Sequence, residues 1–226
     1  MDSRTFNESG SPTLLFVMGL GNQFDDASVG WFVDQLTGAG YRVHTLQLPT
    51  DITDFEREYR RPVQRAHDEH DPAGVVSHSL GGLVTAFLDT TARNVYLSPW
   101  WGIYEGKVSP WARWIVPRLP LQTRVLPTKT HRDELGEHLS DDEWEQLPKR
   151  ISPVFITEIY NAQQVRPSIS ADAVVFVSLA DTIISLKTVG AAVCSDQIRL
   201  YDGGHQLFAA TDRQEVADEV LTELPE

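Results

Sequence analysis

A serine, an aspartate and a histidine occupy positions from which they could together attack an ester or amide bond. Ser79 lies in the motif SHSLGG, Asp181 directly follows the apolar run AVVFVSLA, and His205 lies in YDGGHQLF. A serine hydroxyl is a weak nucleophile, and it needs a base that is itself oriented by an acid. The three residues therefore predict nucleophilic catalysis at Ser79, provided that the fold brings them together.

The segment SHSLGG is close to the motif G-x-S-x-G, in which a sharp turn from a strand into a helix exposes the serine hydroxyl. Gly81 and Gly82 are in place, whereas Ser77 stands at the position of the first glycine. Serine is small, so a close approach of the backbone can survive there. The alternative is that Ser79 only caps the helix that follows.

The acid and the base each have rival candidates. Asp181 could simply cap a helix, and Asp202 is the serious alternative acid, because Asp172 and Asp196 precede their strands and so lie at the wrong edge of a sheet. His205 could be a surface loop histidine. The nearer His78 is a poor base, since neighbouring side chains of a strand point to opposite faces.

Acyl transfer also requires N–H donors for the developing oxyanion. Leu80 follows the nucleophile and supplies one backbone N–H, and Leu20 in MGLGN is the expected second. Gly19 and Gly21 could instead form a dinucleotide-binding turn. That motif needs a third glycine, and Phe24 occupies its place.

Two histidines suggest a metal site that we do not expect to form. His67 and His70 have the i, i+3 spacing that places two imidazoles on one helix face. Their neighbours Arg65, Asp68 and Glu69 are typical of a solvated helix end. We therefore expect neither a metal nor a cofactor.

The elements that must position these residues alternate between short apolar runs and helical patterns, which is typical of a mostly parallel sheet with helices on both faces. Loops that follow parallel strands gather at one edge of the sheet, so residues far apart in sequence can meet there. We expect about six strands, at residues 13–18, 41–46, 74–78, 94–97, 173–179 and 197–201.

After the fourth of these strands the alternation breaks, and residues 99–165 are expected to form an inserted lid within a single domain of residues 1–226. The stretch is rich in proline and tryptophan. Trp100, Trp101 and Trp111 are candidates for binding a hydrophobic acyl or aryl group. The alternative is that they only pack the lid onto the body.

The chain resembles the α/β-hydrolase superfamily over nearly its whole length, from MGLG through SHSLGG and LADTII to GGHQLF. The resemblance implies that Ser79 is the nucleophile, His205 the general base and then acid, and Asp181 the orienting acid. It also implies that Leu20 and Leu80 donate to the oxyanion. Members often carry His-Gly where this chain has Met18-Gly19, and their usual first hairpin is expected to be missing here.

Composition limits the partners and the compartment. The net charge of −13 argues against nucleic acid and anionic membranes, which demand a basic face. No apolar run approaches the roughly 20 residues that span a bilayer, and no secretory signal is evident, so a cytoplasmic protein is expected. The single Cys194 is expected to be a buried structural thiol. Scarce lysine and abundant acid fit either a salt-adapted protein or an ordinary acidic enzyme.

These observations predict hydrolysis of a small hydrophobic carboxylic ester through an acyl-enzyme on Ser79. A thioesterase, a lysophospholipase or a haloperoxidase-like perhydrolase would use the same residues. A ligand-binding receptor or scaffold that keeps the fold without turnover is the alternative from another class, because fold does not fix function. The oligomeric state does not follow from the sequence.

Overall fold

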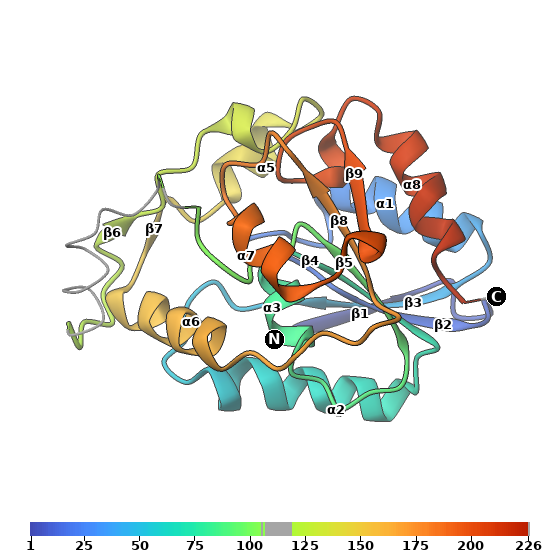
Figure 1. The fold of residues 1–226 in the computed structure, drawn as a ribbon, viewed down its shortest axis with the longest axis horizontal. Helices are drawn as coiled ribbons and strands as arrows, with labels where there is room; N and C mark the ends of the chain where they lie inside the picture. Colours follow the sequence, from blue (N-terminus) through green and yellow to red (C-terminus); the bar gives the residue numbers. More distant parts are fainter. Residues whose placement is uncertain (105, 107–118, 226) are drawn as a thin grey trace.

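The computed structural model describes residues 1–104, 106 and 119–225, and a seven-stranded sheet forms its centre (Figure 1). The strand order is β1-β3-β2-β4-β5-β8-β9, and every neighbouring pair is parallel except β1 and β3. The strands are β1 (Asp2–Phe6), β2 (Thr13–Val17), β3 (Arg42–Gln47), β4 (Gly74–His78), β5 (Arg93–Leu97), β8 (Val174–Ser178) and β9 (Ile198–Tyr201).

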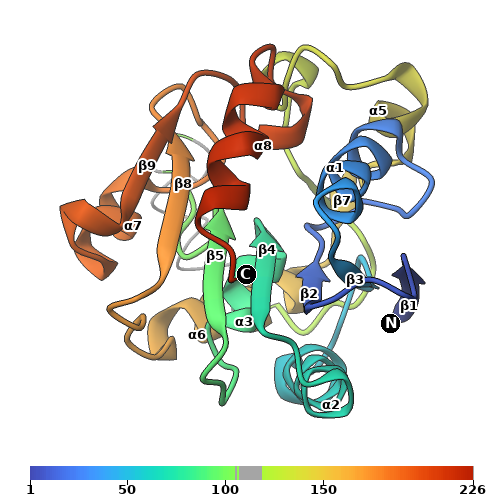
Figure 2. The same cartoon turned by 90° about the vertical axis from the view of Figure 1, so that its right-hand side faces the viewer.

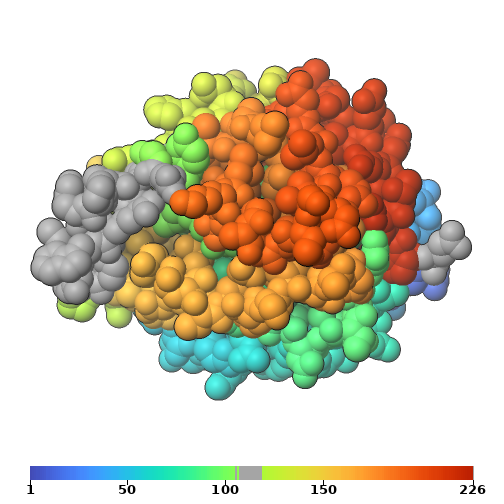
Figure 3. All heavy atoms as spheres, viewed as in Figure 1, coloured from blue at the N-terminus to red at the C-terminus, as the bar shows by residue number. Residues whose placement is uncertain are grey.

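Helices cover both faces of this sheet (Figure 2). On one face lie α1 (Ala27–Gly38) and α8 (Arg213–Thr222), and on the other lie α2 (Arg61–His70), α3 (Leu80–Thr85) and α6 (Pro153–Val165). The π-helical segment η1 (Glu56–Arg60) runs directly into α2. The shorter elements are β6 (Leu126–Pro127), η3 (Arg132–Glu134), α5 (Asp141–Gln146), β7 (Arg150–Ile151), α7 (Leu186–Ala192), η4 (Ser195–Gln197) and η5 (Leu207–Ala209). On the surface drawn in Figure 3, α6 lies between α7 and α2.

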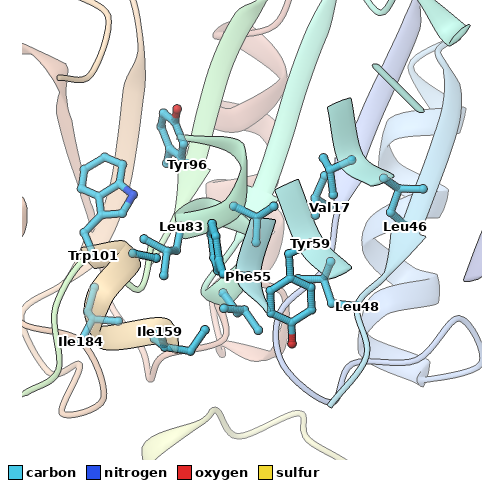
Figure 4. Close-up of a cluster of buried hydrophobic side chains, with 14 of the residues drawn as sticks. Val17, Leu46, Leu48, Phe55, Tyr59, Leu83, Tyr96, Trp101, Ile159 and Ile184 are labelled. Atoms are coloured by element: carbon cyan, nitrogen blue, oxygen red, sulfur yellow. The ribbon is translucent and has the colours of Figure 1, made fainter. Parts of the chain in front are cut away.

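The hydrophobic core has two parts, one on each face, because successive side chains of a buried strand point to opposite sides. In β2, Leu15 and Val17 pack under α2, α3 and α6, whereas Leu14 and Phe16 pack under α1 and α8. Figure 4 shows the first of these clusters, which also contains Trp101.

All six expected strands are present, and the sheet has a seventh that the sequence did not indicate. The sequence of β1 is DSRTF, and its residues are exposed or half-buried, so no apolar periodicity marks it as a strand. It forms because its backbone pairs with β3, from Asp2 opposite Gln47 to Phe6 opposite Val43. An antiparallel strand therefore precedes β2, where the resemblance suggested that the first hairpin was missing.

Residues 98–152, between β5 and α6, interrupt the alternation of strands and helices, and we call them the insertion. Its described part holds η3, α5 and the small antiparallel pair of β6 and β7. A role as a lid stays a prediction, and Trp111 lies outside the described residues. The expectation for Cys194 was wrong, because its side chain is exposed near the end of α7. Among the described helices, none is long and apolar enough to cross a membrane.

Candidate active site

Ser79 occupies a strained turn between β4 and α3. Its backbone has φ 50° and ψ −113°, a conformation that residues other than glycine rarely adopt. A Cβ atom at Gly81 would lie 2.2 Å from the carbonyl oxygen of Val17, so only glycine lets α3 approach the end of β2. Ser77 fits in place of the first glycine, because its Oγ accepts a hydrogen bond from the Thr85 hydroxyl at 2.9 Å.

The three residues singled out in the sequence lie in one chain of hydrogen bonds. His205 Nε2 is 2.8 Å from Ser79 Oγ, and His205 Nδ1 is 2.7 Å from Asp181 Oδ2. Ser79, His205 and Asp181 are 7%, 4% and 2% exposed, so solvent screens these contacts little. The rival acid Asp202 is exposed, and Asp181 is the carboxylate that contacts His205.

The loop after β8 stabilises the charge on Asp181. Its Oδ1 accepts from the backbone N–H groups of Ile183 and Ile184, at 2.8 and 3.2 Å. Burial opposes ionisation, but the His205 imidazole and these two N–H groups lower the pKa of Asp181 below its ordinary value. The ionised carboxylate accepts the Nδ1 proton of His205, which leaves Nε2 free to accept the proton of the Ser79 hydroxyl.

Leu20 follows β2 and Leu80 follows β4, and these two strands are adjacent in the sheet. Leu80 is the first residue of α3, and the first N–H groups of a helix have no partner within it. Leu20 lies in a tight turn in which the Gly19 N–H donates to Asn22 Oδ1 at 3.2 Å and the Asn22 N–H donates to the Gly19 carbonyl at 3.3 Å. A Cβ atom at Gly81 would lie 2.8 Å from the Met18 carbonyl oxygen, so the segment that leads into this turn packs against the start of α3.

His78 packs against Phe208, on the α1 and α8 side of the sheet, and its two ring nitrogens have partners other than Ser79. Its Nδ1 is 3.1 Å from Asn22 Oδ1, and its Nε2 is 3.3 Å from the His205 carbonyl oxygen. Burial, and then the neighbouring His205, lower the pKa of His78 to about 3, so the ring is neutral. Sequence reasoning missed Asn22 entirely, because nothing local distinguishes it from other loop asparagines.

The insertion contacts the loop that carries His205. The Glu134 carbonyl accepts the His205 N–H, and the Leu135 carbonyl accepts the Gln206 N–H, both at 2.8 Å. The approach is close: a Cβ atom at Gly204 would lie 2.6 Å from the Leu135 backbone, and one at Gly136 would lie 2.6 Å from the Ala209 carbonyl. The insertion therefore packs closely against the loop that carries His205 and holds it by two backbone hydrogen bonds.

The start of the insertion holds the loop that carries Asp181. The Ser185 N–H donates to the Gly102 carbonyl at 2.9 Å, and the Tyr104 N–H donates to the Ile183 carbonyl at 3.1 Å. Further along, the Thr182 hydroxyl donates to the Glu134 carboxylate at 2.7 Å. The acid loop and the base loop are thus both fastened to the insertion.

The tryptophans predicted to bind substrate have different environments. Trp101 is 1% exposed, and its indole N–H donates to the Gly82 carbonyl at 2.9 Å, so its ring is part of the core. This favours the alternative that it only packs the insertion onto the body. Trp100 is half-buried, and its backbone N–H donates to the Ser79 carbonyl at 2.9 Å, which puts it next to the nucleophile.

His67 and His70 have separate partners. His67 Nε2 is 2.7 Å from the Thr90 hydroxyl, and the His70 ring stacks on His44 with centroids 3.7 Å apart. Across residues 1–104, 106 and 119–225, no three side chains gather that could hold a metal ion.

Comparisons with known proteins place the chain. The model of the alpha/beta hydrolase family matches residues 14–219, and the chain belongs to this family. No curated protein sequence matches it. The structure is similar to a monoacylglycerol lipase from Paleococcus ferrophilus, with a TM-score of 0.77, 18% identity and 98% of each chain covered.

Two further solved structures share the fold. A soluble variant of monoglyceride lipase from Saccharomyces cerevisiae, in complex with a substrate analog, has a TM-score of 0.71 at 15% identity and covers 98% of this chain and 89% of its own. Est1E from Butyrivibrio proteoclasticus with bound ferulic acid has a TM-score of 0.59 at 14% identity, over 97% and 92%. At such identities the likeness establishes the fold alone.

Proposed function

We propose that the protein is a serine hydrolase that cleaves carboxylic esters with a hydrophobic acyl or aryl group. The observation that carries the proposal is the chain of hydrogen bonds from Ser79 Oγ through His205 to Asp181, at 2.8 and 2.7 Å. A buried serine in a strained turn, with an imidazole at its hydroxyl and a carboxylate behind that imidazole, is the arrangement that activates an alcohol as a nucleophile.

The reaction follows from these groups. Ser79 Oγ attacks the ester carbonyl carbon while its proton passes to His205 Nε2, and the carbonyl oxygen becomes an oxyanion to which the Leu20 and Leu80 N–H groups donate. His205 then returns the proton to the departing alcohol, which leaves an acyl group on Ser79. A water molecule then attacks the acyl carbon while its proton passes to His205 Nε2. His205 returns that proton to Ser79 Oγ as the bond between Oγ and the acyl carbon breaks, which releases the carboxylic acid and the free serine.

Two observations support a hydrophobic substrate. Trp100 lies beside the nucleophile, and the insertion carries exposed apolar side chains at Leu119, Leu121 and Val125. Apolar side chains of this kind suit contact with an apolar acyl or aryl group. The similar solved structures include a monoacylglycerol lipase and a monoglyceride lipase, which makes a single-chain acyl ester our first candidate.

Labelling with a fluorophosphonate probe tests the proposal most directly. The probe is expected to modify Ser79, and Ser79→Ala is expected to lose both the label and turnover of a p-nitrophenyl ester, by a factor on the order of 10⁴ to 10⁶. Ser98→Ala is a matched control, because Ser98 is also buried with a positive φ, of 43°, at the end of a strand. Labelling at another residue, or turnover by folded Ser79→Ala, would refute the proposal.

A panel of p-nitrophenyl esters of graded acyl length defines the substrate. If the acyl site is hydrophobic, kcat/KM is expected to rise as the acyl chain lengthens beyond acetyl. The expected rise is about tenfold for each methylene group that the site buries well. Matched thioesters and lysophospholipids separate the thioesterase and lysophospholipase alternatives. A preference for acetyl over every longer chain would contradict a hydrophobic acyl site.

A further inference from the structure

Two buried polar side chains, Asn22 and His78, lie between the turn that carries Leu20 and the loop that carries His205. They are 4% and 3% exposed, and neither contacts Ser79 Oγ. Burying a polar side chain reduces the stability of the fold unless new hydrogen bonds replace those that the side chain made to water. Their contacts therefore indicate what the pair does.

On one side, Asn22 and His78 contact the turn that follows β2. Asn22 Oδ1 accepts the Gly19 N–H at 3.2 Å, and the Asn22 N–H closes the turn on the Gly19 carbonyl at 3.3 Å. A Cβ atom at Gly19 would lie 2.5 Å from His78 Nδ1 and 2.8 Å from Asn22 Oδ1. The turn that carries Leu20 thus packs directly against both side chains.

On the other side, His78 contacts the backbone of the base. Its Nε2 is 3.3 Å from the His205 carbonyl oxygen, which also faces the Tyr201 hydroxyl at 3.2 Å. The ring centroids of His78 and His205 are 5.1 Å apart, and those of His78 and Phe208 are 5.0 Å apart. A neutral imidazole has one N–H, so it donates to Asn22 or to His205 at any moment and contacts the other oxygen without a proton.

We propose that His78 and Asn22 are positioning residues that set the spacing between the oxyanion turn at Gly19-Leu20 and the base His205. This inference rests on the proposed serine-hydrolase function. The physical reason is that the N–H donors and the base must both reach one tetrahedral centre, and a misplacement of about 1 Å can cost a factor on the order of 10² in rate.

The test compares Asn22→Ala and His78→Ala with two buried residues of the same types elsewhere. We expect kcat for a p-nitrophenyl ester to fall about 10- to 100-fold with KM changed less than about threefold, because binding of the ground state does not use the oxyanion donors. Fluorophosphonate labelling should slow in parallel. The controls are Asn94→Ala, at the amino end of β5, and His44→Ala, in β3, both buried and remote from the site.

The double variant tests whether the two residues act together. If they set one spacing, Asn22→Ala with His78→Ala should lose about as much kcat as the worse single variant; losses that multiply would overturn the pairing. Unchanged kcat in folded Asn22→Ala would overturn the proposal outright. Rates are expressed per labelled Ser79, and Asn22→Ser with His78→Gln replaces the alanine variants if these do not fold.

The two proposals can fail separately. If Ser79→Ala keeps its turnover, the serine-hydrolase function is wrong. If Ser79→Ala is inactive while the Asn22 and His78 variants match their controls in kcat, only the positioning role is wrong.

Discussion

The serine side and the histidine side of the candidate site are built in different ways. Ser79 owes its conformation mainly to the strained turn between β4 and α3 and to Gly81, which lets α3 pack on β2. Trp100, at the start of the insertion, adds one hydrogen bond to the Ser79 carbonyl. His205 follows β9, but its loop is fastened by the insertion, through the carbonyls of Glu134 and Leu135. The nucleophile thus lies in the turn between two consecutive elements, whereas the loop of the base is held by residues of the insertion that come much earlier in the chain.

The largest expected effect on the histidine side comes from Asp181→Asn. An amide in place of the carboxylate favours the wrong tautomer of His205, so kcat is expected to fall by a factor of about 10⁴ while the fold persists. Asp202→Asn is the control, because Asp202 is exposed and is the rival acid that the sequence offered. Ester turnover and thermal unfolding of both variants measure the result. A large loss with Asp202→Asn alone would reverse the assignment.

A smaller effect is expected from separating the insertion from the base. Gly136 has φ 155°, and a Cβ atom there would lie 2.6 Å from the Ala209 carbonyl oxygen. Gly136→Ala should push the insertion off the His205 loop and reduce kcat by about 10- to 100-fold, with Ser79 geometry intact. Steady-state kinetics, with urea unfolding to confirm folding, provide the measurement.

Gly30→Ala is the matched control for that variant. A Cβ atom at Gly30 meets nothing within 4 Å, and the residue lies inside α1. Alanine there should keep full activity and stabilise the fold by about 0.5–1 kcal/mol. Full activity of Gly136→Ala would show that the base does not need the insertion, and the contrast between the two sides would disappear.

The smallest effect concerns a second anchor of the insertion, at the start of α1. The Glu143 carboxylate accepts from the backbone N–H of Ser28 at 2.9 Å and from its hydroxyl, so a residue of α5 caps α1. Asp26 is buried beside it. Burial, together with the charge of Glu143, raises the pKa of Asp26 from 3.8 to about 6.

This raised pKa predicts a pH dependence of stability. Because folded Asp26 holds its proton more tightly than the unfolded chain does, its contribution is complete below about pH 4 and is lost as the pH rises through 6. Asp26→Asn should therefore gain on the order of 1–3 kcal/mol relative to the wild type between pH 4 and pH 7. Urea unfolding at both pH values measures this, and an equal difference at both would contradict it.

Much of the fold could be read from the amino-acid sequence, because fully buried parallel strands are apolar runs that a local pattern reveals. Six strands were found in this way, and β1 was not, since its exposed polar residues become a strand only by pairing with β3. The order of Ser79, Asp181 and His205 along the chain, each after a strand, was likewise visible, as was the family that this order resembles.

Other features depend on the folded arrangement. The contact of His205 with Asp181 and not Asp202, the burial of Trp101 in the core, and the place of Asn22 between two loops all arise where distant segments meet. Local periodicity records which face of an element is buried, but it holds no information on which loops exchange hydrogen bonds across the edge of a sheet. For that reason the residues of the site could be named from the sequence, while their partners had to come from the structure.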